Sequence, residues 1–152
     1  MGELSSVEEI LEYAITREVE ANEFYLALAD RVENPAMGEL ILEFAKEELE
    51  HKAKLELEVM KRGKVVAEDE DAVELKLTDY MVDVVDNPAM DYKDLLLLGM
   101  KKEKTSFRLY IDLAAIIQDE ELRETLLSLA EEEARHKVQL EIDYDEVVLR
   151  KN

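Results

Sequence analysis

The stretch Glu48-Leu49-Glu50-His51 returns 85 positions later as Glu133-Ala134-Arg135-His136, so the chain carries two Glu-x-x-His motifs. A Glu stands 30 positions before each motif, and a Tyr follows seven positions after that Glu. No other histidine occurs in the 152 residues. The two matching sets are Glu18, Tyr25, Glu48 and His51 in the first half, and Glu103, Tyr110, Glu133 and His136 in the second. Identical spacing in both sets indicates an internal repeat.

The first half reads as a pair of helices, because apolar residues recur at helical spacing in two segments. The first segment spans 6–32 and opens with Ser6-x-x-Glu9, the pattern of a capping box. The second begins at Asn34-Pro35, where Asn is a favoured N-cap and Pro a favoured first helical residue. It is expected to run to about position 62, before a glycine at 63.

The second half repeats this plan. Asp91-x-x-Asp94 stands where the first capping box stood, and Asp119 takes the place of the Asn cap. Apolar stripes again run through both segments at helical spacing. We therefore predict an all-α, antiparallel four-helix bundle that forms a single domain over 1–152, with repeat halves at about 6–63 and 91–150 and a crossover at 64–90.

The crossover does not repeat. It is acidic at 68–71, and from Thr78 it offers a short amphipathic helix that would use Tyr80, Met81, Val84 and Val85. If the halves are related by a two-fold axis, the first and third helices are antiparallel, and the connection must travel the length of the bundle. A helix of this size is about 40 Å long. A linker of this length reaches that far at about 3.3 Å per residue.

Composition excludes several classes of function. The absence of Cys excludes disulfides, thiolate zinc sites, iron–sulfur clusters and a rubredoxin-like iron centre. The formal net charge of −20 argues against binding nucleic acid, whose phosphates require the opposite sign. No apolar run is long enough to span a membrane, and the first residues lack the features of a signal peptide. We therefore expect a cytoplasmic protein.

The repeated acids and histidines are expected to meet in the middle of the bundle. At 1.5 Å per residue, Glu18 lies about 18 Å along its helix. Glu48 lies about 20 Å down the antiparallel second helix, at the same level. His51 shares the face of Glu48, since residues three apart are neighbours on a helix. Several buried carboxylates would repel one another unless cations were present. We therefore predict two divalent metal ions, for which iron, manganese and zinc are all suitable.

Glu plus Glu-x-x-His, repeated across four helices, resembles the ferritin-like di-iron carboxylate superfamily, in which metal sites are built in a bundle core. The Glu-to-Tyr spacing of Glu18 with Tyr25, and of Glu103 with Tyr110, is similar to that of its rubrerythrin-like branch. The chain lacks the cysteine-ligated electron-transfer domain of full rubrerythrins. Ser106 stands where those proteins have an extra Glu.

The resemblance implies a role for each member of the repeat. The metal ligands would be Glu18 and Glu103 as terminal ligands, Glu48 and Glu133 as bridging ligands, and His51 and His136 as one ligand for each ion. Tyr25 and Tyr110 are placed to hydrogen-bond to the ligands, with simple core packing as the alternative. Glu47 and Glu132, which precede the motif glutamates, are expected to face solvent.

The function that we expect is that of a di-iron oxidoreductase acting on hydrogen peroxide or O2. Since the chain has no Cys and no flavin motif, electrons would come from an external donor protein or from ferrous iron. One alternative is iron handling, either as a ferroxidase or in storage. Another is a structural metal site that pins the bundle, for which zinc would serve. We also expect a homodimer.

Overall fold

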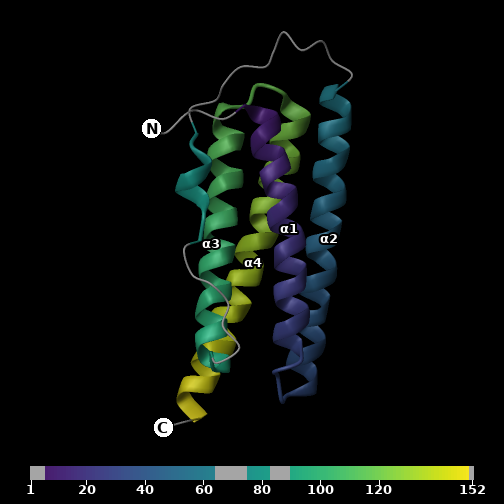
Figure 1. Ribbon diagram of the computed structural model, residues 1–152. Coiled ribbons are helices and arrows are strands. Elements are labelled where there is room, and N and C mark those ends of the chain that lie inside the picture. Colours follow the sequence, from purple (N-terminus) through teal and green to yellow (C-terminus); the bar gives the residue numbers. More distant parts are fainter. Residues whose placement is uncertain (1–5, 64–74, 83–89, 151–152) are drawn as a thin grey trace.

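The computed structural model describes residues 6–63, 75–82 and 90–150. Four long helices account for most of them: α1 (Val7–Ala29), α2 (Pro35–Gly63), α3 (Tyr92–Ile116) and α4 (Glu120–Arg150). No strand occurs among these residues. The fold is therefore the all-α four-helix bundle that the sequence predicts (Figure 1).

The helix starts are set by the predicted capping residues. The Ser6 hydroxyl accepts from the Glu9 N–H at 3.1 Å, and the Glu9 carboxylate accepts from the Ser6 N–H at 2.8 Å, which completes the capping box. Side-chain oxygens of Asn34, Asp91 and Asp119 accept from the first N–H groups of α2, α3 and α4. Each cap satisfies backbone donors that a helix end leaves without a partner.

Two ends differ slightly from the prediction. The sequence predicts that the first helix continues to residue 32, but α1 ends at Ala29. Tight turns follow, in which the N–H groups of Arg31 and Val32 donate to carbonyls three residues back. Such turns are a common way for a helix to end. Helix α2 includes Gly63, one residue beyond the predicted end.

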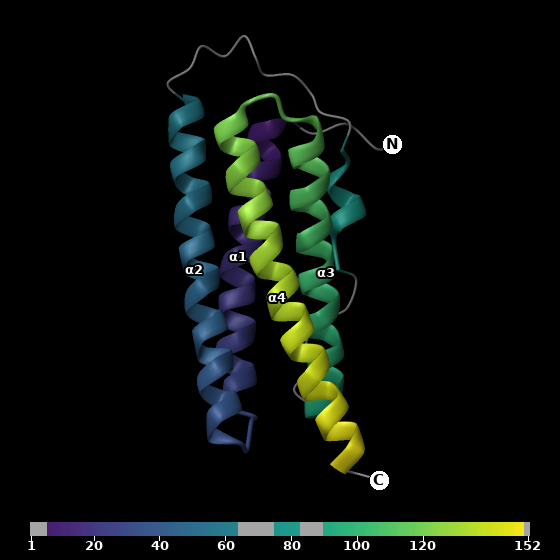
Figure 2. The same cartoon turned by 180° about the vertical axis from the view of Figure 1, so that it is seen from behind.

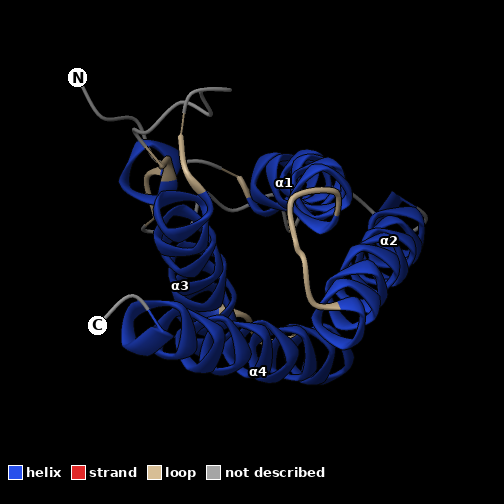
Figure 3. Cartoon of the chain, turned by 90° about the horizontal axis from the view of Figure 1, so that it is seen from below, coloured by secondary structure: helices blue, strands red, loops and turns tan. Residues whose placement is uncertain are grey.

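The helices form two antiparallel hairpins, α1 with α2 and α3 with α4 (Figure 1). Seen along its axis, the bundle places the four helices around a common interior (Figure 3). Helix α4 runs obliquely, so that its start lies near the end of α2 and its last turns extend past α3 (Figure 2). Most helix contacts lie within a hairpin, and the hairpins meet through α1 with α3 and α2 with α4.

The connection between the hairpins crosses the bundle lengthwise. Helix α2 ends at one end of the bundle and α3 begins at the other (Figure 1). Of the crossover, the structure describes residues 75–82, which include a short 3₁₀ helix, η2 (Leu77–Tyr80). The Tyr80 side chain is buried, and its hydroxyl donates to Asp112 at 2.6 Å. Tyr13 donates to the Tyr80 carbonyl at 3.2 Å.

The predicted amphipathic helix from Thr78 is thus only a single 3₁₀ turn within the described residues. The backbone is extended again at Met81, whose side chain is exposed. Burial of Tyr80 between its partners anchors this segment without a longer helix. The predicted positions Val84 and Val85, and the acidic run at 68–71, lie outside the described residues.

The core consists of two apolar clusters. One contains residues from the start of α1 and α4, including Ile10, Leu11 and Leu126. The other contains residues from the later turns of the same helices, including Leu28 and Leu140. A layer of buried ionisable residues lies between them along each helix. None of the described helices has the length and apolar character needed to cross a membrane.

Candidate metal centre

Six ionisable residues occupy the layer between the two apolar clusters. Helices α1 and α3 each contribute one glutamate, and α2 and α4 each contribute a glutamate and a histidine one turn apart. All six residues are at most 2% exposed: Glu18, Glu48, His51, Glu103, Glu133 and His136. The structure therefore brings together every ligand that the sequence predicts, in the interior of the bundle.

These residues form two overlapping groups. Glu18, Glu48, His51 and Glu133 each offer a ligand atom, and these atoms lie within 4.8 Å of one another. The same holds for Glu48, Glu103, Glu133 and His136. The two groups share Glu48 and Glu133, while each has its own histidine and its own glutamate from α1 or α3. The arrangement is compatible with two neighbouring metal ions that share two carboxylates.

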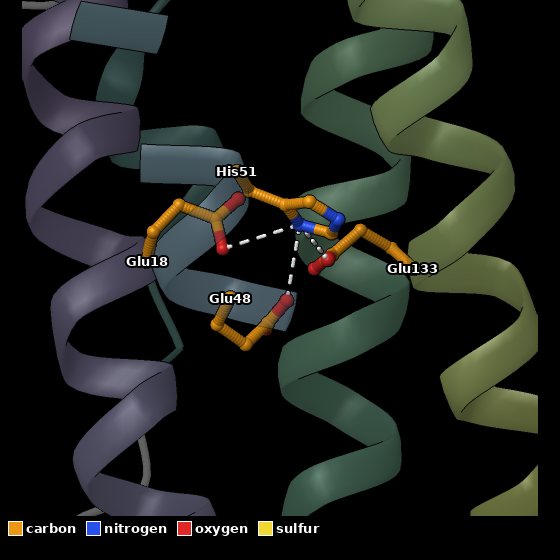
Figure 4. Close-up of side chains that lie close together, drawn as sticks. All are labelled: Glu18, Glu48, His51 and Glu133. Carbon is orange, nitrogen blue, oxygen red and sulfur yellow. Dashed lines mark ion pairs between the residues drawn. The ribbon is translucent and has the colours of Figure 1, made fainter. Parts of the chain in front are cut away.

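The His51 group shows how closely the atoms converge (Figure 4). His51 Nδ1 lies 2.9 Å from Glu133 Oε1, 3.1 Å from Glu48 Oε1 and 3.6 Å from Glu18 Oε1. In the other group, His136 Nδ1 lies 3.0 Å from Glu103 Oε2 and 3.8 Å from Glu48 Oε1. In both groups the Nδ1 atom faces the carboxylates, so it is the nitrogen available to a metal ion.

Several polar atoms of the layer have no hydrogen-bond partner. Among the described residues, the buried atoms of this layer without a hydrogen bond of good geometry are Glu18 Oε1, both oxygens of Glu48, His51 Nδ1 and Glu133 Oε1. Buried polar groups normally have partners, since leaving one unsatisfied costs about 1–3 kcal/mol. All five belong to the first group or to the shared carboxylates. Divalent cations fit this donor set, because carboxylate oxygen and imidazole nitrogen both ligate them.

Protons balance the charges of the layer when no cation is bound. Burial, followed by repulsion from neighbouring carboxylates, raises the pKa of Glu48 and of Glu133 well above the usual range. Burial also disfavours the charged form of Glu103, but hydrogen bonds from His136 and other neighbours outweigh it and lower its pKa.

Both histidines hold their protons more tightly than usual. Burial opposes the charged imidazolium of His51, but the close carboxylates of Glu133 and Glu18 outweigh it and raise its pKa to about 11. The pKa of His136 is also raised, because contacts with Glu103 and Glu47 outweigh burial. A metal ion would have to displace these protons in order to bind.

The two repeated tyrosines bond across the halves of the chain. The Tyr25 hydroxyl, on α1, donates to Glu103 Oε2 on α3, and the Tyr110 hydroxyl, on α3, donates to Glu18 Oε2 on α1. Burial and the nearby carboxylates raise the pKa of both tyrosines well above the usual value, so both remain donors. Each tyrosine fixes one oxygen of the glutamate from the opposite hairpin.

Glu47 and Glu132 do not face solvent, contrary to the expectation from sequence. Their side chains are 17% and 26% exposed, and each approaches the histidine of the opposite hairpin. Glu132 Oε1 lies 2.8 Å from His51 Nε2, and Glu47 Oε1 lies 2.6 Å from His136 Nε2. A carboxylate on Nε2 holds the proton there and turns Nδ1 toward the ion positions.

The sequence contained one signal for these two residues. Both copies of the motif carry a Glu immediately before the ligand Glu. The sequence alone predicts that both face solvent, since they only precede the ligand glutamates. The contacts depend on how the two hairpins pack, since each carboxylate reaches from α2 to α4 or from α4 to α2.

Comparison with known proteins agrees with this geometry. The rubrerythrin family model matches residues 9–142. A solved structure of a hypothetical protein from Pyrococcus furiosus superposes with a TM-score of 0.71 at 29% sequence identity, over 91% of this chain and 87% of that one. None of the curated proteins matches the chain. The family match covers both hairpins and all six buried ligand candidates, and the chain belongs to the rubrerythrin family.

Proposed function

We propose that the protein binds two iron ions in the buried layer and acts as an oxidoreductase that reduces hydrogen peroxide or O2 with electrons from an external donor. The observation that carries this proposal is the pair of overlapping four-residue groups that share Glu48 and Glu133. Shared carboxylates belong to two neighbouring ions. A single ion would leave part of the buried carboxylate charge uncompensated.

The donor set favours a site for chemistry over a structural clamp. Six protein ligands for two ions leave coordination positions open, whereas structural sites are usually closed by protein ligands. Two irons held about 3.5–4 Å apart can supply two electrons together to one small oxidant. Carboxylate and imidazole also suit manganese and zinc, so metal identity has to be tested directly.

The residues around the ligands would keep the site rigid and dry. Tyr25 and Tyr110 would hold the glutamates of α3 and α1 in fixed orientation through their hydroxyl donors. Glu47 and Glu132 would hold the two imidazoles with Nδ1 inward. The apolar clusters on either side of the layer would exclude bulk water. Such surrounding contacts set how precisely a metal site is positioned.

The test is metal analysis followed by turnover. Protein loaded anaerobically with ferrous iron is expected to hold two ions per chain. On repeated addition of hydrogen peroxide with a reductant, we expect catalytic consumption of peroxide without ferric particles. Glu58→Gln, which changes a buried acid outside the two groups, is the matched control for Glu48→Gln. One ion per chain, or none, would contradict the di-metal assignment.

The competing function is iron handling, and the acidity of the chain favours it as the second candidate. A formal net charge of −20 attracts cations to the surface. In the same experiment this function would appear as ferric particles that grow with each addition of ferrous iron and oxidant. Peroxide would then be consumed only in proportion to the iron supplied.

A further inference from the structure

The ligands obey the internal repeat, but the rings around them do not. Phe24 and Phe44 flank Tyr25 in the first half, whereas the corresponding positions beside Tyr110 are Leu109 and Leu129. All four of these flanking side chains are buried. The two proposed ion positions are therefore alike in their ligands and unlike in their surroundings.

The first-half rings form a continuous series that reaches His136 first, and the His136 ring in turn stacks on that of His51 at 6.2 Å. Phe24 and Tyr25 have ring centroids 5.5 Å apart, and Tyr25 and Phe44 have centroids 5.6 Å apart. Phe44 stacks on His136 at 4.1 Å with an interplanar angle of 25°. Tyr25 also lies 6.0 Å from the His136 ring. Since the Tyr25 hydroxyl donates to Glu103, both contacts lead to the Glu103–His136 position.

The outer end of the series reaches the surface. Phe24 lines a surface cavity of about 380 Å³ together with Arg17, Glu20, Glu23, Val82 and Lys102, among others. This cavity brings together α1, α3 and the crossover segment. The Lys102 ammonium lies 5.4 Å from the Phe24 ring centroid, within the range of a cation–π contact.

Gly99 makes room for this ring. A Cβ atom at Gly99 would lie 3.2 Å from Phe24 Cε2 and 3.1 Å from Leu140 Cδ1. At the corresponding position of the first half stands Ala14, and the residue that corresponds to Phe24 in the second half is the smaller Leu109. The packing thus accommodates an aromatic ring on one side of the repeat only.

We propose that the Phe24–Tyr25–Phe44 series is the route by which electrons reach the Glu103–His136 position, and that the cavity at Phe24 receives an uncharged, planar aromatic donor of the hydroquinone or reduced-flavin type. This proposal rests on the proposed oxidoreductase function. Electron tunnelling falls steeply with distance. Closely packed rings provide electronic coupling for a single tunnelling step between the cavity and this position, and no ring is itself oxidised or reduced. The second half has no such series beyond Tyr110 among the ring contacts of the described residues.

The chemistry of the cavity selects the class of donor. Two basic and two acidic side chains line it, so its charges balance, and an uncharged ring loses nothing to the strong net charge of the chain. Phe24 gives the cavity an apolar edge beside the Lys102 ammonium, and a volume of this size holds a small ring system. The reduced ring gives up two electrons and two protons and becomes the oxidised ring. Bound iron would pass these two electrons on to hydrogen peroxide, which takes them with two protons to form two waters.

The kinetic test uses dihydroriboflavin and iron-loaded protein. Stopped flow measures the rate at which dihydroriboflavin reduces the ferric protein in the variants Phe24→Leu and Phe44→Leu. Each substitution puts into the first half the residue that stands at the corresponding position of the second half. Phe107→Leu is the matched control, because Phe107 is the third Phe of the chain and is only partly buried, outside the ring series. We expect a several-fold slower reduction in the first two variants, unchanged rates in the control, and two irons in all three.

A second arm needs no metal. Binding of oxidised riboflavin to metal-free protein, followed by flavin fluorescence, is expected to weaken several-fold in Lys102→Ala and Phe24→Leu and to be unchanged in Phe107→Leu. Equal reduction rates in all variants would overturn the route, and absence of riboflavin binding would overturn the donor class. Both results would leave peroxide turnover with another reductant intact. The proposed function would instead be contradicted if no reductant supported peroxide turnover while the Phe substitutions still slowed reduction and weakened riboflavin binding.

Discussion

The Tyr110 hydroxyl donates to Glu18 across 92 positions of sequence, and its repeat partner Tyr25 donates in the same way to Glu103. Each bond joins one hairpin to a ligand candidate of the other. Removing the hydroxyl in Tyr110→Phe would leave a buried carboxylate oxygen without its donor. We expect a loss of about 1–3 kcal/mol in the free energy of unfolding, the usual penalty for such a group.

Urea unfolding of metal-loaded protein measures this loss. Tyr13→Phe is the control, since its hydroxyl donates only to a backbone carbonyl at a partly buried position. We expect a smaller effect there. Equal losses in Tyr110→Phe and Tyr13→Phe would show that the buried carboxylate does not depend on its tyrosine.

Shared and unshared ligands are expected to respond differently to substitution. Replacing a shared carboxylate, as in Glu133→Gln, should abolish binding of both ions, because Glu133 belongs to both four-residue groups. Replacing His51 by Ala should mainly weaken one ion, because His51 belongs to a single group. Elemental analysis after dialysis gives the stoichiometry. Retention of two ions by Glu133→Gln would contradict a bridging role.

The carboxylates that hold the imidazoles should tune metal affinity without being ligands. Glu47→Ala and Glu132→Ala are each expected to lower affinity about 10–100-fold, the usual effect of losing a hydrogen bond to a ligating histidine. Competition with a chromophoric chelator measures the change. Glu50→Ala, at an exposed position of α2, is the control and should leave affinity unchanged. Affinity unchanged in all three variants would mean that the Nε2 contacts are incidental.

Metal-free protein is expected to lose stability as pH rises. The pKa values of Glu48 and Glu133 are raised above 4.5, and that of His51 is raised from 6.5 to about 11. In these ranges the folded chain holds protons that the unfolded chain has released. Stability from these groups is therefore present at low pH and is lost as pH rises above about 4.5 for the acids and between about 6.5 and 11 for His51.

Metal binding should reverse this trend. Protons compete with the ions for the same oxygen and nitrogen atoms, so the loaded protein should lose stability as pH falls. Metal at 100 times its dissociation constant adds about 2.7 kcal/mol per site when the unfolded chain does not bind it. Thermal melts of both forms between pH 5 and 8 provide the measurement. Parallel trends in the two forms would count against a metal site in this layer.

Two glycines offer a matched test of packing. Gly99→Ala is expected to destabilise the fold by about 1–3 kcal/mol, because its Cβ would crowd Leu140 and Phe24. Gly38→Ala meets nothing within 4 Å and should stabilise α2 by about 0.5–1 kcal/mol. Thermal unfolding distinguishes the two directions. A stabilised Gly99→Ala would show that the Phe24 ring moves aside without cost.

The repeat made most of the fold and the ligand set predictable. Helix starts at Ser6, Asn34, Asp91 and Asp119 follow from local capping chemistry, which needs no tertiary information. Helical rise alone placed Glu18 and Glu48 at one level. The role of Glu132 was not predictable in this way, because it depends on how α4 is rotated about its own axis relative to α2. Helical periodicity within one segment does not determine that rotation.

The ring series was missed for a different reason. The repeat indicates the Glu, His and Tyr positions that the two halves share, and it gives no signal at positions where the halves differ. Phe24 and Phe44 differ from their counterparts Leu109 and Leu129, and all four fit an apolar core equally well by sequence. The stacking of Phe44 on His136 is what distinguishes its role from that of an ordinary core residue, and it is known only from the structure.

Because most helix contacts lie within a hairpin, the order of folding is also constrained. Contacts between residues close in sequence form faster than those that close long loops. Each hairpin can therefore form early, while the ion positions come into being only when one hairpin docks on the other. A spectroscopic signal from a bound ion would then report the last step of assembly. The rate at which that signal appears would measure how quickly two preformed hairpins dock in the correct register.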